Sequence, residues 1–209
     1  MVDKNSKSSK QVIMEAAIEL FAEKGFDGAR VDEIAKRAQV NKALIYYYFE
    51  SKDKILEELM SVLIKDMIDL KDQLTININV LEPMNDSKVD DFIYQAYKFF
   101  KKRKLLLNII LSEALKGATN KNIFFEMLSL NIADGVGRIK QMNGEITDFE
   151  EFNIIAIFFN FIPLLNFISF GEKWAEYNHM DYSFLESKFY QTFKLIYKDY
   201  FLKTVFPKE

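Results

Sequence analysis

Residues 31–52 read VDEIAKRAQVNKALIYYYFESK, and this stretch decides the fold of the N-terminal part of the chain. Apolar residues recur at helical spacing on both sides of Gln39 and Val40, which predicts two short amphipathic helices joined by a tight turn. Asn41 is the expected N-cap of the second helix, because its side chain can accept a hydrogen bond from the first turn. Such a pair of helices has the helix-turn-helix arrangement that fits a DNA major groove.

Helices are also expected on both sides of this motif. Upstream, Ser8 and Gln11 can form a capping box at the start of a helix that Gly25 ends. Downstream, apolar residues at three- and four-residue spacing predict a long helix from Lys52 to about Leu74. The sequence of the N-terminal part therefore predicts a three-helix domain followed by a long fourth helix.

The rest of the chain carries the same helical periodicity. Residues 75–81 alternate like a strand, but Pro83 follows, so we interpret them as a frayed helix end and a loop. Pro163 predicts a kink near Phe159 in one of the later helices. The fold class is therefore all-α, with an N-terminal domain over 1–54 and a helical C-terminal domain over 55–209. The further helices are expected at about 87–102, 104–116, 120–142, 148–174 and 182–205.

Composition argues against several classes of function. The 209 residues carry a net charge of −3, no cysteine and a single histidine, His179. No thiolate site, multi-histidine metal cluster or glycine-rich phosphate loop can be recognised, so we expect no enzyme, no metal and no cofactor. The first ten residues are polar with no apolar segment behind them, which favours a cytoplasmic location.

The segment 152–171 contains no charged residue, and its length is close to the roughly 20 residues of a transmembrane helix. Asn153, Asn160, Asn166 and Pro163 interrupt it, and a helix that is apolar all round can instead be buried on all sides. We favour a helix packed between its own domain and a partner subunit. The alternative is a membrane-attached helical interaction protein that uses this segment.

A set of short motifs, in order and at fixed spacing from about Lys10 to Leu56, resembles the DNA-binding domain of the tetracycline-repressor (TetR) family. The resemblance implies an all-helical homodimer whose larger C-terminal domain binds an effector and dimerises through the two C-terminal helices. It also implies a transcriptional regulator, expected here to be a repressor that leaves a palindromic double-stranded DNA operator when a small molecule binds. The motifs are Gly25-Phe26, Ile34-Ala35, Ala38-x-Val40, Leu44-Ile45-Tyr46-Tyr47-x-Phe49 and Ser51-Lys52-Asp53-x-Ile55-Leu56.

The resemblance implies DNA contacts on and beside the second helix of the motif. A lysine at the start of that helix can donate to guanine O6 or N7, and neighbouring methyl groups can meet a thymine methyl. Tyrosine hydroxyls and further cations hold phosphates and set the register without reading sequence. The expected DNA-binding residues are Arg30, Lys42, Ala43, Leu44, Tyr46, Tyr47 and Lys52.

Two positions near these residues carry separate predictions. The family commonly has glycine where Gln39 stands, so we expect a left-handed backbone there, at a cost of roughly 1 kcal/mol for a residue with a side chain. Tyr48 is expected on the inner face of its helix, together with Ile45 and Phe49.

The C-terminal part is rich in aromatic residues, since all but three of the 20 phenylalanines lie at residue 92 or beyond. Core packing and a dimer interface account for most of them, but such density is also typical of an apolar ligand cavity. Polar residues on apolar helices would need partners if buried, and we expect some of them to meet a mostly apolar effector. The expected ligand-binding residues are Phe99, Asn108, Glu113, Met127, Phe159, Asn160 and Asn166.

Overall fold

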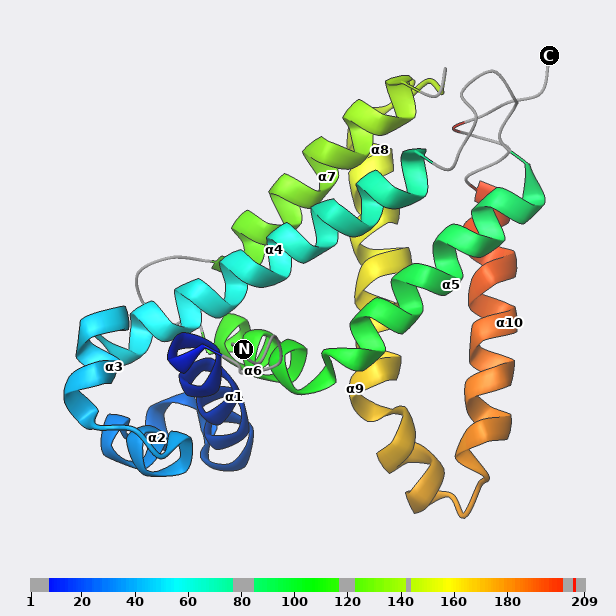
Figure 1. The fold of residues 1–209 in the computed structure, drawn as a ribbon. Helices are drawn as coiled ribbons and strands as arrows, with labels where there is room; N and C mark the ends of the chain where they lie inside the picture. The colour runs from blue at the N-terminus through cyan, green and yellow to red at the C-terminus, as the bar shows by residue number, and fades with distance from the viewer. Residues whose placement is uncertain (1–7, 77–84, 117–122, 142–143, 201–204, 206–209) are drawn as a thin grey trace, which may run out of the picture. The chain divides into compact units, whose positions relative to one another are not determined.

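A computed structural model describes residues 8–76, 85–116, 123–141, 144–200 and 205 (Figure 1). Every element within these ranges is a helix, which confirms the all-α fold. The α-helices are α1 (Ser9–Gly28), α2 (Val31–Ala38), α3 (Lys42–Phe49), α4 (Lys52–Ile76), α5 (Asp86–Lys102), α6 (Lys104–Leu115), α7 (Ile123–Gln141), α8 (Phe149–Ile154), α9 (Ile162–Tyr177) and α10 (Tyr182–Tyr200), and a π-helix (Ile155–Phe161) joins α8 to α9.

The expected helix starts are confirmed where local capping signals existed. The Ser8 side chain accepts from the Gln11 N–H, and Gln11 in turn accepts from the Ser8 N–H, which completes the capping box of α1. The Asn41 carboxamide oxygen accepts from the Ala43 N–H at 2.9 Å and caps α3. The loop expected after α4 falls mainly on residues 77–84, outside the described residues.

The chain divides into two compact units. The N-terminal unit comprises Met1–Lys65 and Leu105–Phe124, and the C-terminal unit comprises Asp66–Lys104 and Phe125–Glu209. Helix α4 therefore belongs to both units, and nearly all of α6 groups with the N-terminal unit. This division by packing differs from the expected one at residue 54, which placed all of α6 in the C-terminal domain.

The core of the N-terminal unit is formed where the first helices meet. Helix α1 packs against both α2 and α3, and the inward-facing side chains are almost fully buried. Arg37 on α2 adds a bidentate ion pair to Glu23 on α1, at 2.6 and 2.7 Å. Burial of this apolar surface holds α3 in place. The largest core side chains here are Ile13, Leu20, Phe21, Ile34, Ile45, Ile55, Met60 and Leu63.

The turn between α2 and α3 confirms the prediction for Gln39, which has φ 54° and ψ 40°. Its N–H donates to the carbonyl of Lys36 and the Val40 N–H donates to the carbonyl of Ala35, at 3.3 and 3.0 Å. These two bonds form a Schellman motif, in which a left-handed residue ends the helix. Gly25, with φ 73°, interrupts the helical backbone of α1, so the expected helix end is a kink followed by one more turn.

The effect of Pro163 differs from the simple kink expected near Phe159. The turns before it form the π-helix, and the Ile162 N–H donates to the carbonyl of Ile157, five residues earlier. A proline lacks the N–H and crowds the preceding turn of an α-helix, and the wider π turn accommodates both effects.

Candidate functional site

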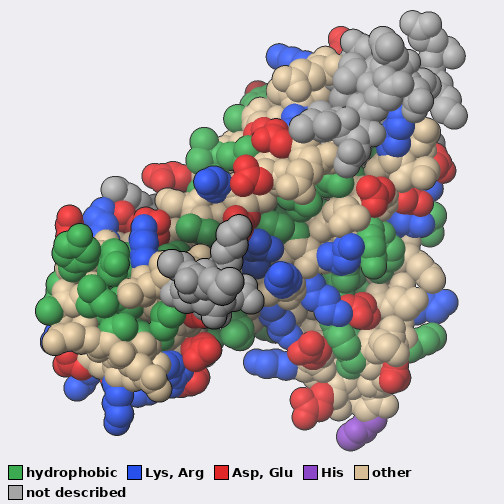
Figure 2. Space-filling view, in the orientation of Figure 1, with side chains coloured by type: hydrophobic (Ala, Val, Ile, Leu, Met, Phe, Trp, Pro, Cys, Tyr) green, Lys and Arg blue, Asp and Glu red, His purple; other side chains and the backbone are tan. Residues whose placement is uncertain are grey.

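Helix α3 separates a buried face from an exposed one. Ile45 and Phe49 are 1% and 3% exposed, whereas Tyr46 and Tyr47 are 46% and 78% exposed. Figure 2 shows side chains of the hydrophobic class, which includes tyrosine, gathered on the surface over α3. The helix is thus held by two apolar anchors and presents its phenol rings to solvent.

Tyr48 does not share the inner face, so that expectation was wrong. The side chain is 39% exposed, and its ring lies edge-on to Tyr47 with the centroids 5.1 Å apart. Ile45 and Phe49, spaced four residues apart, suffice to fill the narrow buried stripe of a helix this short. Three consecutive tyrosines are therefore on the surface of α3.

Lys42, at the start of α3, is exposed and already has an acidic neighbour. Its Nζ lies 2.6 Å from Asp32 Oδ1, and 5.8 Å from the centre of the Tyr46 ring. The hydrogen bond to Asp32 raises the pKa of Lys42, so the ammonium stays charged. An exposed ion pair of this kind contributes little to stability, so exchange of Asp32 for a guanine acceptor has a low cost.

The other residues expected at the start of the interface are also accessible. Ala43 is exposed and Leu44 is half-buried beside it. Arg30, the residue before α2, is exposed, and its guanidinium makes no ion pair with any residue that the structure describes. The structure thus leaves Arg30, Lys42, Ala43, Tyr46 and Tyr47 on the surface of the N-terminal unit.

Lys52, which was expected to contact a phosphate, makes several contacts within the protein. Its Nζ donates to the carbonyl oxygens of Phe26, Ala29 and Asp27, at 2.6, 3.1 and 3.3 Å. It also lies 4.4 Å from the centre of the Phe26 ring. The ammonium therefore satisfies the carbonyls at the end of α1 and fastens the α1–α2 connection to the start of α4.

A cavity of about 220 Å³ lies within the C-terminal unit. Helices α4, α5, α7 and α10, the π-helix and the adjoining turns of α8 and α9 line it, mainly with apolar side chains. Two of the expected ligand-binding residues, Phe99 and Asn160, are in its wall. The Asn160 side chain is 7% exposed and donates to the carbonyl of Ile155 at 2.9 Å, which leaves its carboxamide oxygen as an acceptor.

The other expected ligand residues do not line this cavity. Met127 is fully buried in the core. Asn108 and Glu113 are on α6, within the N-terminal unit, and Glu113 forms an ion pair with Lys116 at 2.6 Å. Both residues therefore lie in a different unit from the cavity.

Phe159 and Asn166 are exposed on the outside of the C-terminal unit. Other large apolar residues of the π-helix, α9 and α10 are exposed as well, and we call this set of side chains the outer aromatic face. It carries no charged residue along α9 until Glu172. Its large exposed members are Phe158, Phe159, Phe170, Trp174, Tyr177, Phe184, Leu195 and Ile196.

The 29-residue segment Phe149–Tyr177 is long and apolar enough to cross a membrane, and its most apolar 18-residue stretch has a mean hydropathy of 2.0. About a third of the most apolar stretch is buried within the chain, including the side that lines the cavity. Its inner side also holds the buried polar residues Asn160 and Ser169. This pattern is that of a helix with one side in its own domain, and it does not favour the membrane alternative.

Sequence reasoning missed the polar residues of the cavity wall, chiefly Lys71, Lys88, Asn131 and Arg138. One signal was available, because Lys71 interrupts the apolar stripe of α4 next to Leu70. The others come from helices whose relative rotation is set by tertiary packing, which no local pattern reveals.

Comparison with known proteins supports the assignment of the N-terminal domain. Residues 13–59 match the family described as bacterial regulatory proteins, tetR family. The biofilm operon icaADBC HTH-type negative transcriptional regulator IcaR of Staphylococcus aureus (strain Newman) is 49% identical over 49 residues. That match covers 23% of this chain and 26% of IcaR, so the relative is similar in its DNA-binding domain alone.

The similarity of the fold extends over almost the whole chain. A transcriptional regulator (TerR/AcrR family) from Aquifex aeolicus VF5 has a TM-score of 0.62 at 24% identity, covering 90% of this chain and 99% of that one. FadR from Bacillus subtilis, solved in complex with stearoyl-CoA, has a TM-score of 0.62 at 17% identity, covering 95% and 99%. At these identities the likeness establishes the fold.

Proposed function

We propose that the chain is a dimeric, DNA-binding transcriptional repressor of the TetR family of bacterial regulatory proteins, whose family model its N-terminal domain matches. The observation that carries the proposal is the exposed side of α3, where Lys42, Ala43, Tyr46 and Tyr47 project together from a rigidly held helix. In this proposal Lys42 reads a guanine edge, the methyl of Ala43 meets a thymine methyl, and the phenols hold phosphates.

The partner subunit is a second copy of the chain, which covers the outer aromatic face. Phe170 and Trp174 are each more than half exposed, and surfaces with such large apolar side chains are typical of protein interfaces. A twofold dimer presents two copies of α3 to half-sites separated by about one turn of DNA, ~34 Å, or a multiple of it. The operator is then palindromic.

The effector occupies the cavity of the C-terminal unit and is mostly apolar. The wall of the cavity supports this, because apolar and aromatic side chains such as Phe92, Phe100 and Phe193 predominate in it. FadR, which shares the fold, was solved with stearoyl-CoA and thus provides a precedent for a ligand with an apolar chain.

Effector binding releases the operator by favouring a second packing of the C-terminal unit. Helix α4 is the element that carries this change, because it starts at the DNA-binding domain and its last turns line the cavity. A differential affinity of ~1–3 kcal/mol between the two states changes operator affinity roughly 5- to 150-fold. The protein acts on DNA in the cytoplasm.

Selection from a pool of random DNA duplexes tests the proposed function directly. Purified protein is mixed with the pool, and bound duplexes are recovered and sequenced over several rounds. We expect one palindromic motif whose half-sites lie one helical turn or a multiple apart. Recovery of unrelated sequences with no shared motif would contradict sequence-specific regulation.

A further inference from the structure

The charged residues in the cavity wall all have the same sign. Lys71 on α4, Lys88 on α5 and Arg138 on α7 line the cavity, and no described aspartate or glutamate does. The Lys71 and Arg138 side chains are only 13% and 14% exposed, and the Lys88 ammonium nitrogen is buried. Cations are rarely placed in an otherwise apolar wall, because burial of a charge is costly without compensation.

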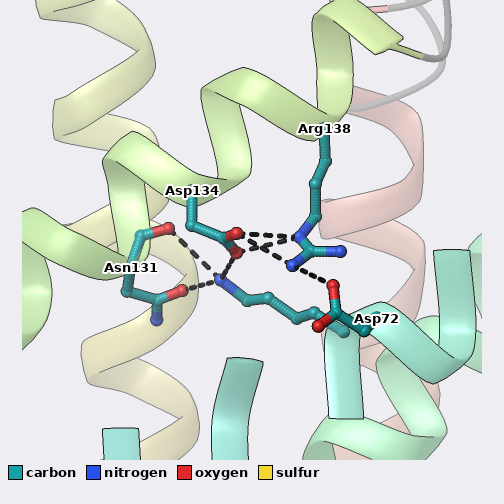
Figure 3. Close-up of polar contacts among 5 residues, drawn as sticks. Asp72, Asn131, Asp134 and Arg138 are labelled. Carbon is teal, nitrogen blue, oxygen red and sulfur yellow. Dashed lines mark hydrogen bonds and ion pairs between the residues drawn. The ribbon is translucent and has the colours of Figure 1, made fainter. Parts of the chain in front are cut away.

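Two of these cations are held in place by neighbouring polar residues, of which the aspartates lie outside the cavity wall. Lys71 Nζ contacts the side chain of Asn131 and lies 3.0 Å from Asp134 Oδ2 (Figure 3). Arg138 NH2 lies 2.9 Å from both Asp134 and Asp72. The carboxylates fix the positions of the cations, while the cations form the surface of the cavity.

Two of the cations lie side by side, because Lys71 on α4 and Arg138 on α7 both contact Asp134. Lys88 lines the same cavity from the first turn of α5. Phe99 and Phe100, near the end of α5, add apolar side chains to the wall. The wall thus combines cationic groups with apolar side chains.

We propose that the effector is an amphipathic carboxylate, whose anionic head lies among Lys71, Lys88 and Arg138 and whose apolar tail fills the remainder of the cavity. The inference rests on the proposed function, since it names the chemical class of the ligand for the same cavity. The carboxylate accepts charge-assisted hydrogen bonds from these cations, whereas a neutral head forms weaker hydrogen bonds and a cationic head adds repulsion.

Burial also lowers the pKa of Lys71, an effect that its hydrogen bond to Asp134 only partly offsets. A bound carboxylate opposes this shift, because a nearby negative charge favours the protonated amine. The tail is accommodated without strain at Gly135, where a Cβ would meet no atom within 4 Å. The helix backbone therefore borders open space at this point of the wall.

Calorimetric titration with matched ligands tests the proposal. The probes are linear carboxylates of eight, ten, twelve and fourteen carbons and 2-naphthoate, each compared with the alcohol and the amine that carry the same tail. At neutral pH we expect at least one carboxylate to bind about tenfold or more tightly than both counterparts. An alcohol or amine that binds as tightly as its carboxylate, or no binding by any probe, would overturn the proposal.

Two pairs of variants locate the site. Lys88→Gln should weaken carboxylate binding about tenfold, while Lys98→Gln, which removes an exposed lysine from the same helix, should not. Gly135→Leu should block binding by filling the cavity, while Gly137→Leu, with equal open space but outside the wall, should leave it intact. Equal effects within both pairs would place the ligand elsewhere.

DNA binding by the ligand-free protein separates this proposal from the proposed function. If a selected operator binds and no carboxylate does, the ligand class is wrong and the regulator remains. If carboxylates bind in the cavity and no operator is found, the regulatory role fails while the ligand class stands.

Discussion

The chain exposes aromatic side chains on two surfaces of different chemistry. On α3, Tyr46 and Tyr47 carry hydroxyl groups and lie beside Lys42. On the outer aromatic face, Phe170 and Trp174 are similarly exposed, and no charged residue precedes Glu172 along α9.

Exposure alone therefore does not identify what a surface binds. Phenol hydroxyls with lysines are suited to a hydrated polyanion, because each can donate a hydrogen bond to a phosphate. A face of phenylalanine, tryptophan and leucine is suited to another apolar surface, because it gains free energy only when water is excluded. We accordingly assign the first to DNA and the second to a second copy of the chain.

The largest effect is expected from Trp174→Glu, on the outer aromatic face. If this substitution leaves dimerisation unchanged, the assignment of that face to the dimer interface is wrong. A carboxylate buried without a partner costs roughly 3–5 kcal/mol, so the dimer should weaken more than 100-fold. Sedimentation equilibrium of the native and variant proteins measures this. Leu115→Glu, at an 88% exposed leucine outside that face, is the control and should remain dimeric.

A native protein that stays monomeric at micromolar concentration would contradict the dimer. Flotation of the same protein preparation with phospholipid vesicles then tests the membrane alternative. We expect the protein to remain in the soluble fraction.

Lys52→Met sharpens the distinction between cations that bind DNA and cations that support the fold. Loss of the ammonium leaves the carbonyls of Phe26 and Ala29 without their donor, and unfolding free energy should fall by about 2 kcal/mol. Chemical denaturation measures this fall. Lys54→Met removes an exposed lysine paired with Glu57 and should leave the unfolding free energy almost unchanged.

The contrary result for Lys52 is also informative. Unchanged stability together with weaker DNA binding would restore the phosphate contact that the family resemblance implied. Such a result would show that Lys52 gives up its contacts with the backbone carbonyls and binds a DNA phosphate instead.

The smallest effect is expected from Gln39→Gly, in the turn that positions α3. Relief of the left-handed strain gains roughly 1 kcal/mol, and the greater freedom of the unfolded chain offsets about 0.4–1 kcal/mol of it. The melting temperature should therefore stay equal or rise slightly. Lys36→Gly, inside α2, should lower stability by about 1 kcal/mol, and a similar loss in Gln39→Gly would refute the strain argument.

The sequence predicted the N-terminal unit well because its signals are local. The capping residues Ser8 and Asn41, the turn at Gln39 and the exposed side of α3 all follow from spacings of a few residues. The exposed face of Tyr48 and the contacts of Lys52 with backbone carbonyls depend on how neighbouring helices pack, which local spacing does not reveal.

The cavity was predicted poorly because it is a tertiary feature. Asn160 and Phe99 line the cavity, whereas Asn166 belongs to the outer aromatic face. Lys71 and Arg138 are brought together from α4 and α7 by helix packing, which a one-dimensional pattern does not encode.

The most direct test of the central claim is a titration of the selected operator with native protein, Lys42→Ala and Tyr47→Phe at 50 and 200 mM salt. We expect salt-sensitive binding by a dimer. Lys42→Ala should weaken operator binding by about 1–3 kcal/mol and relax specificity at one base pair. Tyr47→Phe should weaken binding to all DNA sequences alike, by about 1 kcal/mol. Equal affinity of the native protein for operator and unrelated DNA, unaltered by either substitution, would contradict the assignment of α3 as the recognition helix.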